Sequence, residues 1–324
     1  MTHMCDGAQH PTEISVSVVV PVYRATTSLY PLVTRLETAL DGREFEIILV
    51  DDGSPPSTWE IAAQLALSRR PVRAIRLGRN FGQHNALIAG IRSARHSVIV
   101  TLDDDLQNPP EEVPRLLAAL TSGVDVVYGV SPNVAQRAWR RWGSSLSRKI
   151  ISYLGAVNVT HMSSFRVIRT HLRDGFPKDL GPSVSLDAML SWTTERFATV
   201  EVKHTDRHEG ESNYSASRLV RFALDVATGY SAVPLQLALA LGLITAAFGF
   251  VVLAYVLVRF AISGTSVAGF PFLASIIAIF SGVQLLTLGV IGEYLARMHF
   301  RIMRKPTYVI AETVSGHDRA VGEQ

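Results

Sequence analysis

The chain has 324 residues, of which 48% are hydrophobic and 18% charged, and its mean hydropathy is +0.22. This composition excludes a disordered chain and indicates a folded domain joined to membrane segments. The single cysteine, Cys5, excludes a disulfide scaffold and a cysteine-based zinc site. A net charge of only +3 gives little support for nucleic acid as a partner. Residues 1–14 are polar with no apolar run, so we expect a polar tail and no signal peptide.

Short apolar runs alternate with helical patterns from residue 16 to residue 130. The expected strands are 16–20, 45–50, 72–77, 98–102 and 124–130, and the expected helices are 28–40, 57–67, 83–94 and 110–120. A continuous β-branched run such as Val16–Val20 is typical of a buried parallel strand. Strands that alternate with helices predict an α/β fold with a mostly parallel sheet and helices on both of its faces.

Acidic side chains follow two of the expected strands, as Asp51–Ser54 and as Asp103–Gln107. Ligands of parallel sheets bind at the carboxyl ends of strands, so we expect a binding site at this edge. Asp103 and Asp105 are two residues apart. In extended chain their side chains would point the same way, about 7 Å apart. Their oxygens suit Mg²⁺ or Mn²⁺ that also binds a diphosphate. The alternative is a solvated acidic turn, with Asp105 or Asn108 capping the next helix.

Two common phosphate-binding patterns are absent from the chain. It contains neither G-x-G-x-x-G nor G-x-x-x-x-G-K-[ST], and the segment Gly78–Gly82 has the wrong glycine spacing for either. A nicotinamide-dependent enzyme or an ATPase is therefore disfavoured.

Residues 134–154 predict an amphipathic helix. At 100° per residue, a face with two tryptophans lies opposite a face that carries Arg137 and Arg141. A basic helix with tryptophans lies readily in a membrane interface. Arg141 and Ser145 are one turn apart and are able to bind one phosphate together. A core-packed helix with a solvated arginine face is the alternative. Arg166, in the next expected strand, either faces an acceptor or pairs with an acid, and we favour the pairing.

Two long uncharged segments lie near the C-terminus. Ala232–Val258 and Phe260–Gly292 contain no charged residue, and each is long enough for a helix of about 20 apolar residues that crosses a hydrocarbon core of about 30 Å. A pair of buried core helices is the alternative. Arginine and lysine flank the pair on both outer sides, whereas Arg259 is the only charge between the segments. The positive-inside rule therefore predicts that both ends and the N-terminal domain are cytoplasmic.

Five segments together resemble a known family. They are Val19–Tyr23, Val50–Ser54, Arg79–Gln83, Asp103–Glu111 and Arg207–Tyr214, the last followed by the uncharged pair. This combination is similar to the inverting family-2 glycosyltransferases with a GT-A fold and, among them, to the polyprenyl-phosphate glycosyltransferases. The resemblance runs from about residue 15 to residue 310. It implies a polar tail at 1–14, a GT-A catalytic domain at 15–213, a juxtamembrane helix at 214–231, two transmembrane helices at 232–296 and a cytoplasmic tail at 297–324.

The resemblance also implies roles for individual residues. The nucleotide sugar would be held by Pro21, Tyr23, Asp51, Asp52 and Ser54. The catalytic group would be Asp103, Asp104, Asp105 and Gln107, with Mg²⁺ or Mn²⁺ on Asp103, Asp105 and Gln107. The acceptor phosphate would meet Arg137, Arg141, Ser145, Arg207, Ser212 and Tyr214. The resemblance further implies a UDP-sugar donor, an undecaprenyl or decaprenyl phosphate acceptor, a bacterial plasma membrane location and a homo-oligomer such as a tetramer.

The implied reaction is inverting transfer of a sugar to a lipid phosphate for cell-envelope glycan modification. A phosphate monoester needs no general base, because its second pKa is about 6 and it is largely dianionic at neutral pH. Two alternatives stay open at this point. One is transfer to a protein or glycan hydroxyl, which would need a base, and the other is an inactive membrane scaffold that binds a nucleotide sugar.

Overall fold

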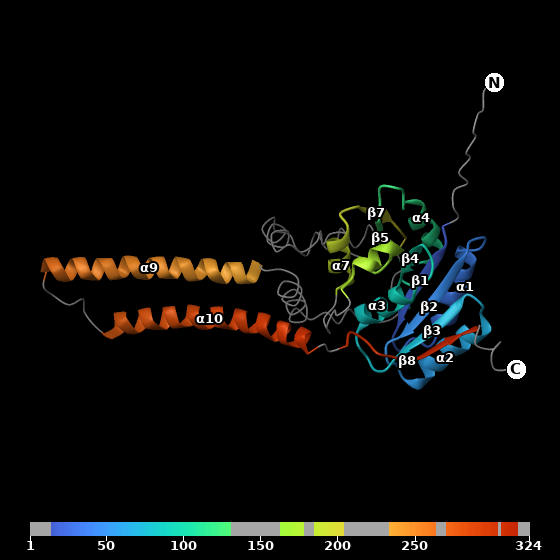
Figure 1. The fold of residues 1–324 in the computed structure, drawn as a ribbon, viewed down its shortest axis with the longest axis horizontal. Coiled ribbons are helices and arrows are strands. Elements are labelled where there is room, and N and C mark those ends of the chain that lie inside the picture. The colour runs from blue at the N-terminus through green and yellow to red at the C-terminus, as the bar shows by residue number, and fades with distance from the viewer. Residues whose placement is uncertain are drawn as a thin grey trace, which may run out of the picture. The chain divides into compact units, whose positions relative to one another are not determined.

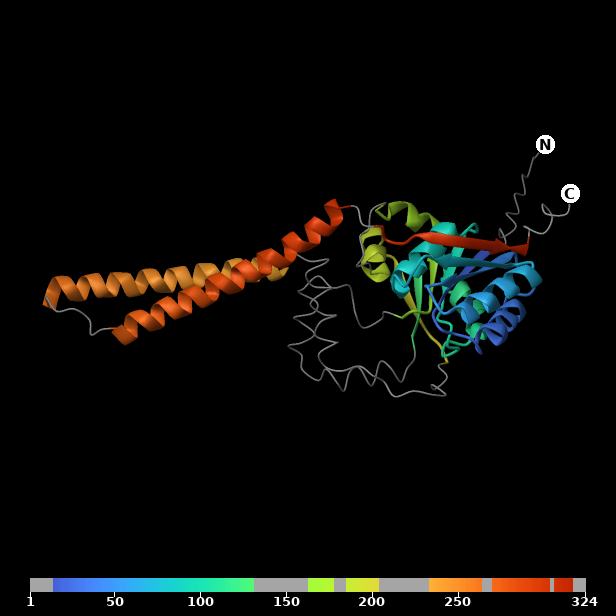
Figure 2. The same ribbon diagram turned by 90° about the horizontal axis from the view of Figure 1, so that it is seen from below.

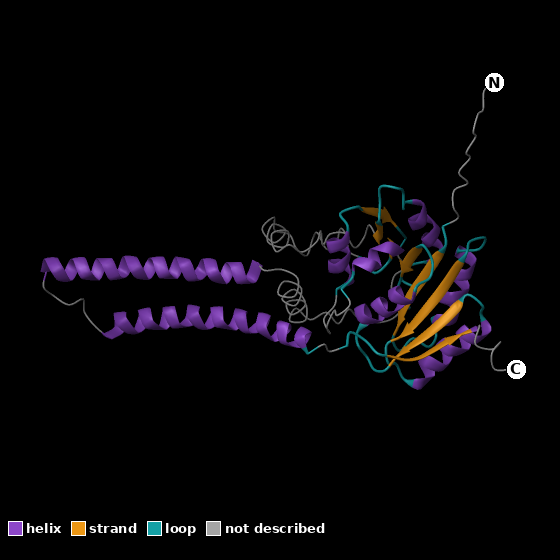
Figure 3. Cartoon of the chain, in the orientation of Figure 1, coloured by secondary structure: helices purple, strands orange, loops and turns teal. Residues whose placement is uncertain are grey.

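The computed structural model describes residues 14–130, 163–177, 185–203, 233–263, 270–303 and 306–316. The chain divides into two compact units. The first contains an eight-stranded sheet with its helices, and the second contains two long helices (Figure 1). Figure 3 shows the same elements coloured by type.

The sheet is mostly parallel, as the alternating pattern predicted. Its strands are β1 (Val16–Val22), β2 (Phe45–Asp51), β3 (Val72–Leu77), β4 (Val98–Thr101), β5 (Val126–Val130), β6 (Arg166–Arg169), β7 (Phe197–Glu201) and β8 (Ile310–Ser315). Their order is β7-β5-β6-β4-β1-β2-β3-β8. β6 is antiparallel to both β4 and β5, and β8 is antiparallel to β3. All five strands expected from the sequence are present, and their ends shift by at most two residues.

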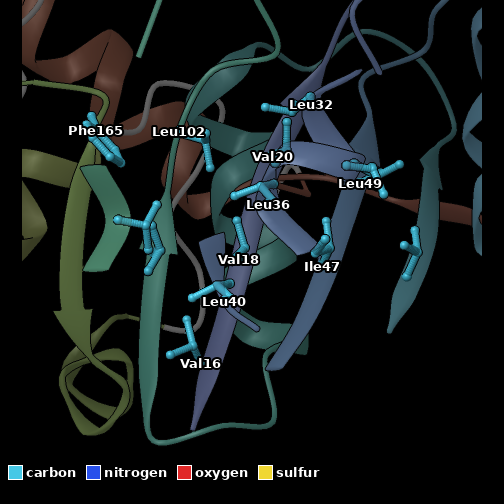
Figure 4. Packing of buried hydrophobic residues seen from close by; sticks show 14 of the residues in the cluster. Val16, Val18, Val20, Leu32, Leu36, Leu40, Ile47, Leu49, Leu102 and Phe165 are labelled. Carbon is cyan, nitrogen blue, oxygen red and sulfur yellow. The ribbon is translucent and has the colours of Figure 1, made fainter. Parts of the chain in front are cut away.

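Helices cover both faces of this sheet. They are α1 (Leu29–Ala39), α2 (Pro56–Ser68), α3 (Gln83–Ser93), η1 (Pro110–Glu112), α4 (Val113–Ala118), η3 (Thr170–Gly175) and α7 (Leu186–Thr193). One apolar cluster packs α1, α2 and α4 against one face, and a second packs α3, η3 and α7 against the other. Every residue of β1 is buried because both faces are covered. Val16, Val18 and Val20 point into the first cluster (Figure 4), while Val19 between them belongs to the second.

β8 changes the expected division of the chain. The segment 297–324 was expected to be a cytoplasmic tail, but Ile310–Ser315 pairs with β3 and forms one edge of the sheet (Figures 1 and 2). The unit that contains the sheet therefore includes residues that follow both long helices. The sequence hides this strand because its first four residues are exposed and two of them are polar, so no apolar alternation marks it.

The second unit contains α9 (Val233–Ser263) and α10 (Phe270–Ile302). Within them, Leu235–Ile262 has a mean hydropathy of 2.5 and Ile279–Ala296 one of 1.5, and both are long and apolar enough to cross a membrane. Only 6% of the first window and none of the second is buried within the structure. Their large apolar side chains, such as Phe250 at 74% exposure, therefore lack the protein cover that a pair of soluble core helices would have.

Candidate active site at the carboxyl ends of the strands

Loops that follow β1, β2 and β4 meet at one edge of the sheet. The Tyr23 backbone N–H, just after β1, donates to Asp104 Oδ2 at 3.1 Å, and the Arg24 N–H donates to Ser54 Oγ at 3.1 Å. The side chain of Tyr23 is 46% exposed at this edge, while Pro21 is buried within β1. The edge thus brings Tyr23, Ser54 and Asp104 together as the sequence predicted.

Asp103 is held by two side chains that come from different elements. Asp103 Oδ1 accepts from Gln83 Nε2 at 2.6 Å, and Oδ2 accepts from Ser164 Oγ at 2.6 Å. Gln83 begins α3, and Ser164 lies just before β6. The carboxylate is therefore fixed in orientation before any ligand arrives, and neither Gln83 nor Ser164 was among the residues chosen from the sequence. Gln83 ends the Arg79–Gln83 motif, which was a usable signal, whereas nothing in the sequence marks Ser164.

Asp105 is exposed and lies on a tight turn. Leu106 adopts a left-handed backbone with φ of +60°, and Asp105 accepts from the Gln107 N–H at 3.1 Å and from Gln107 Nε2 at 2.6 Å. Gln107, expected as a metal ligand, instead donates through its amide nitrogen to Asp105. Its amide oxygen is the atom left to meet a cation.

Electrostatics at this edge favours a bound cation. Burial raises the pKa of Asp104 to about 6, the Tyr23 N–H opposes this, and repulsion from Asp103 and Asp105 adds to it. Burial also raises the pKa of Asp103. The hydrogen bond from Ser164 lowers this pKa, and the charge of Asp105 raises it. A divalent cation would relieve this repulsion between carboxylates.

The donor set fits a metal that is shared with a substrate. Among the described residues, no group of three or more His, Cys, Asp and Glu side chains is arranged to hold a metal by itself. Asp103 and Asp105 are hard oxygen donors, and Mg²⁺ commonly takes one or two carboxylates, substrate phosphate oxygens and water. Asp103 and Asp105 would therefore form a complete metal site only together with the oxygens of a bound diphosphate.

Asp51 and Asp52 have different surroundings although they are adjacent. Asp52 accepts from the Phe81 N–H at 2.7 Å and from the Gly82 N–H at 2.8 Å, so both of its oxygens hold the loop after β3. Asp51 Oδ1 accepts from the Ser54 N–H at 3.2 Å, whereas its buried Oδ2 has no hydrogen-bond partner and lies 3.8 Å from Arg76 Nε. Burial raises the pKa of both carboxyls. Asp51 thus offers an acceptor, and Asp52 positions a loop.

Comparisons with known proteins agree with this geometry. Residues 17–174 match the family model of glycosyl transferase family 2. Undecaprenyl-phosphate 4-deoxy-4-formamido-L-arabinose transferases are relatives along nearly the whole chain. The one from Pseudomonas paraeruginosa is 37% identical over 306 residues, which cover 92% of this chain and 90% of the relative. The one from Aeromonas hydrophila is 34% identical over 308 residues, covering 92% and 94%. The chain belongs to glycosyl transferase family 2.

A solved family-like structure supports the fold. Glucosyl-3-phosphoglycerate synthase from Mycobacterium tuberculosis, crystallised with Mn²⁺ and UDP-glucose, is 19% identical and superposes with a TM-score of 0.50. The match covers 66% of this chain and 77% of the synthase. The expected GT-A fold of this glycosyltransferase is therefore confirmed.

A buried polar network lies behind the carboxylates of the glycosyltransferase. Arg166, 2% exposed, pairs with Asp187 at the start of α7, and Tyr128 OH donates to Asp187 at 2.9 Å. The Arg166 guanidinium also lies 5.8 Å from the centre of the Tyr128 ring. The sequence-based choice that Arg166 pairs with an acid is confirmed, and its charge also lowers the pKa of Asp103. Burial and the charge of Arg166 lower the pKa of His84 beside them, and the charge of Asp187 opposes this.

Six predicted acceptor residues lie outside the described residues. They are Arg137, Arg141, Ser145, Arg207, Ser212 and Tyr214. The same holds for the amphipathic helix expected at 134–154 and the juxtamembrane helix expected at 214–231. Their roles stay predictions.

Proposed function

We propose that this glycosyltransferase transfers a sugar, with inversion, from a nucleotide sugar, a UDP-sugar by preference, to undecaprenyl or decaprenyl phosphate. The main support is the alignment with undecaprenyl-phosphate sugar transferases over 92% of the chain, which includes the two apolar helices. An α/β domain attached to such helices is suited to a donor dissolved in water and an acceptor embedded in lipid. The product would serve cell-envelope glycan modification.

The carboxylates after β4 would bind the leaving diphosphate through a divalent metal. Asp103 and Asp105, with the amide oxygen of Gln107, are the residues that would hold Mg²⁺ or Mn²⁺, and the ion would neutralise charge on the departing nucleotide. Gln83 and Ser164 orient Asp103 for this task through two 2.6 Å hydrogen bonds. Because the ligand is already oriented, no free energy is needed to reorganise it during the reaction.

The acceptor would attack without a protein base. A lipid phosphate is already largely dianionic at neutral pH, so the main obstacle is repulsion between two anions. Arg137, Arg141 and Arg207, with Ser145, Ser212 and Tyr214, are the groups that we expect to hold the acceptor phosphate. Arg166 is not one of them, because Asp187 already pairs with it.

A hydroxyl acceptor is less well supported. It would need a general base within hydrogen-bond reach. Asp187, a buried acid near the site, is engaged by Arg166 and Tyr128, and Asp104 Oδ2 already accepts from the Tyr23 N–H. An inactive scaffold would have no use for the two hydrogen bonds that fix Asp103. We further propose a bacterial plasma membrane location with both spans crossing, a cytoplasmic catalytic domain and a homo-oligomer.

The proposal is tested with membranes that contain the protein. They are incubated with a panel of radiolabelled nucleotide sugars, and the extracted lipid is analysed for label. Asp105→Ala should abolish transfer and leave membrane insertion intact, because it removes a metal ligand from an exposed turn. Asp174→Asn, at an acid in η3 that is 80% exposed, is the matched control and should keep full activity. Transfer by Asp105→Ala without added metal would contradict the metal-dependent mechanism.

A further inference from the structure

A small polar pocket lies at the same edge of the sheet as the carboxylates. Its volume is about 260 Å³, and its lining comes from three strands or the loops that follow them. The lining residues are Gly53, Ser54, Arg76, Leu77, Gly78, Arg79, Ala311 and Glu312. A complete ligand of drug size occupies at least about 300 Å³, so this pocket fits one part of a larger molecule.

β8 supplies one wall of this pocket. Because β8 runs antiparallel to β3, its first residues lie at the edge where β2 and β3 end. Arg76 is opposite Glu312 and Leu77 is opposite Ile310, so Ala311 is an extra residue that forms a bulge. Bulges of this kind often re-aim side chains beside active sites. The Gly78 N–H donates to Val309 O at 2.9 Å and fixes the start of this wall.

The pocket lies at a suitable distance from the carboxylates for a nucleoside. Strands are about 4.8 Å apart, and two to three strand spacings separate β4 from the ends of β2 and β3, which gives about 10 to 14 Å. If a diphosphate binds at Asp103 and Asp105, a nucleoside attached to it reaches the pocket. The sugar then lies toward β6 and β5, on the other side of β4.

The Glu312 carboxylate in the pocket favours a group that can donate hydrogen bonds. The Arg76 guanidinium is held 5.6 Å from the Trp59 ring centre and 3.8 Å from Asp51, and Arg79 lies 4.5 Å from the Phe81 ring centre. The Glu312 carboxylate makes no hydrogen bond or ion pair with other residues in the described part of the chain, and it would repel a phosphate. A carboxylate only accepts hydrogen bonds, so it selects an N–H or O–H group.

We propose that Glu312 of β8 is a specificity-determining residue that accepts a hydrogen bond from the donor nucleoside. The shared chemistry is a ribose hydroxyl or a base N–H. This inference rests on the proposed function only in taking a nucleotide as the donor, and it does not depend on the acceptor. It assigns a role in donor binding to a strand that the chain reaches only after both apolar helices.

The test measures nucleotide binding to the full-length protein in detergent with Mn²⁺ present. Calorimetric titrations use UDP, CDP, GDP, ADP and 2′-deoxy-UDP, with inorganic pyrophosphate as a ligand that lacks a nucleoside. Glu312→Ala should weaken binding of the preferred nucleoside diphosphate about tenfold and leave pyrophosphate binding unchanged. Thr313→Ala is the matched control, because alternation along the strand places its side chain on the other face. Both variants should keep the thermal unfolding temperature of the wild type.

The panel separates the two sources of the hydrogen bond. If the partner is the ribose 2′-hydroxyl, 2′-deoxy-UDP binds wild type and Glu312→Ala alike while every ribonucleotide loses affinity in the variant. If the partner is the 3′-hydroxyl, 2′-deoxy-UDP loses affinity in the variant as well. If the partner is a base N–H, the loss is confined to the preferred base. Equal affinity of wild type and Glu312→Ala for every nucleotide would overturn the inference and leave the proposed function standing. Conversely, a Glu312-dependent affinity in a protein that transfers no sugar to lipid would support the inference and contradict the proposed acceptor.

Discussion

Asp103 illustrates how single residues prepare the site. A carboxylate beside two other acids repels them, yet hydrogen bonds from Gln83 and Ser164 hold it in one orientation. Hydrogen-bonding partners of metal ligands are typically worth about 10–100-fold in metal affinity. We therefore expect Ser164 to affect metal binding although it would touch neither metal nor substrate.

Ser164→Ala should weaken the apparent affinity for Mn²⁺ about tenfold, because Asp103 Oδ2 loses its 2.6 Å partner. At saturating Mn²⁺ the rate of transfer should largely recover, since the ligand itself remains. Titrating activity against Mn²⁺ measures both quantities. Ser163→Ala is the control, because among the described residues Ser163 Oγ makes a single hydrogen bond, accepted from the Phe165 N–H, and none to Asp103. A rate that stays low at all Mn²⁺ concentrations would assign Ser164 a different role.

At the scale of elements, the sequence predicted what depends on local patterns. The β-branched strands, their helices and the acidic strand ends were found because each has its own periodicity or composition. The antiparallel insertion of β6 and the addition of β8 were missed, because they depend on pairing between distant segments. Dependence on distant segments also limits prediction within the site. Asp51 and Asp52 are identical in type and adjacent in sequence, and they differ only in the hydrogen-bond partners that the tertiary structure provides.

A buried network around Glu46 lies where the central strands begin, at the end of the sheet opposite their carboxyl ends. Glu46 accepts from Ser17 Oγ of β1 at 2.7 Å, from Arg73 of β3 at 2.8 Å and from the Arg95 N–H before β4 at 2.7 Å. Burial alone would raise the pKa of Glu46, but these bonds outweigh it and lower the pKa. One carboxylate thus links β1, β2, β3 and the segment before β4.

Glu46→Gln should lower the free energy of unfolding at pH 7 by about 2 kcal/mol, because it removes a charge that is paired and buried. Since the folded pKa lies below the unfolded value of about 4.3, the stabilisation is complete above that value and is lost as the pH falls through the folded pKa. Urea unfolding at pH 7 and at pH 3 should show the difference shrinking at the lower pH. Glu37→Gln, at a more exposed pair with Arg69, should cost less than about 0.5 kcal/mol. A pH-independent loss at Glu46 would argue against the charged network.

For the molecule as a whole, β8 constrains the membrane topology. β8 and β3 belong to one sheet, although α9 and α10 lie between them in the chain. The segments before α9 and after α10 must therefore be on the same side of any membrane. If one helix crosses, both do. This argument does not use the arginines and lysines that flank α9 and α10. It nevertheless leads to the same expected topology, a hairpin in which both helices cross and both outer ends lie on one side.

If α9 and α10 both cross a membrane, we expect the short segment between them on the side opposite the sheet domain, and thiol labelling tests this expectation. Cys5 is the only cysteine, so Cys5→Ser gives a clean background for Thr265→Cys in that segment and, separately, for Thr313→Cys in β8. In sealed spheroplasts, a membrane-impermeant maleimide should label Thr265→Cys at once, and Thr313→Cys only after permeabilisation. Labelling of Thr313→Cys but not of Thr265→Cys from outside would reverse the orientation that the flanking charges predict. Labelling of neither before permeabilisation would mean that α9 and α10 do not cross, since the pairing of β8 with β3 leaves no topology in which only one of them does.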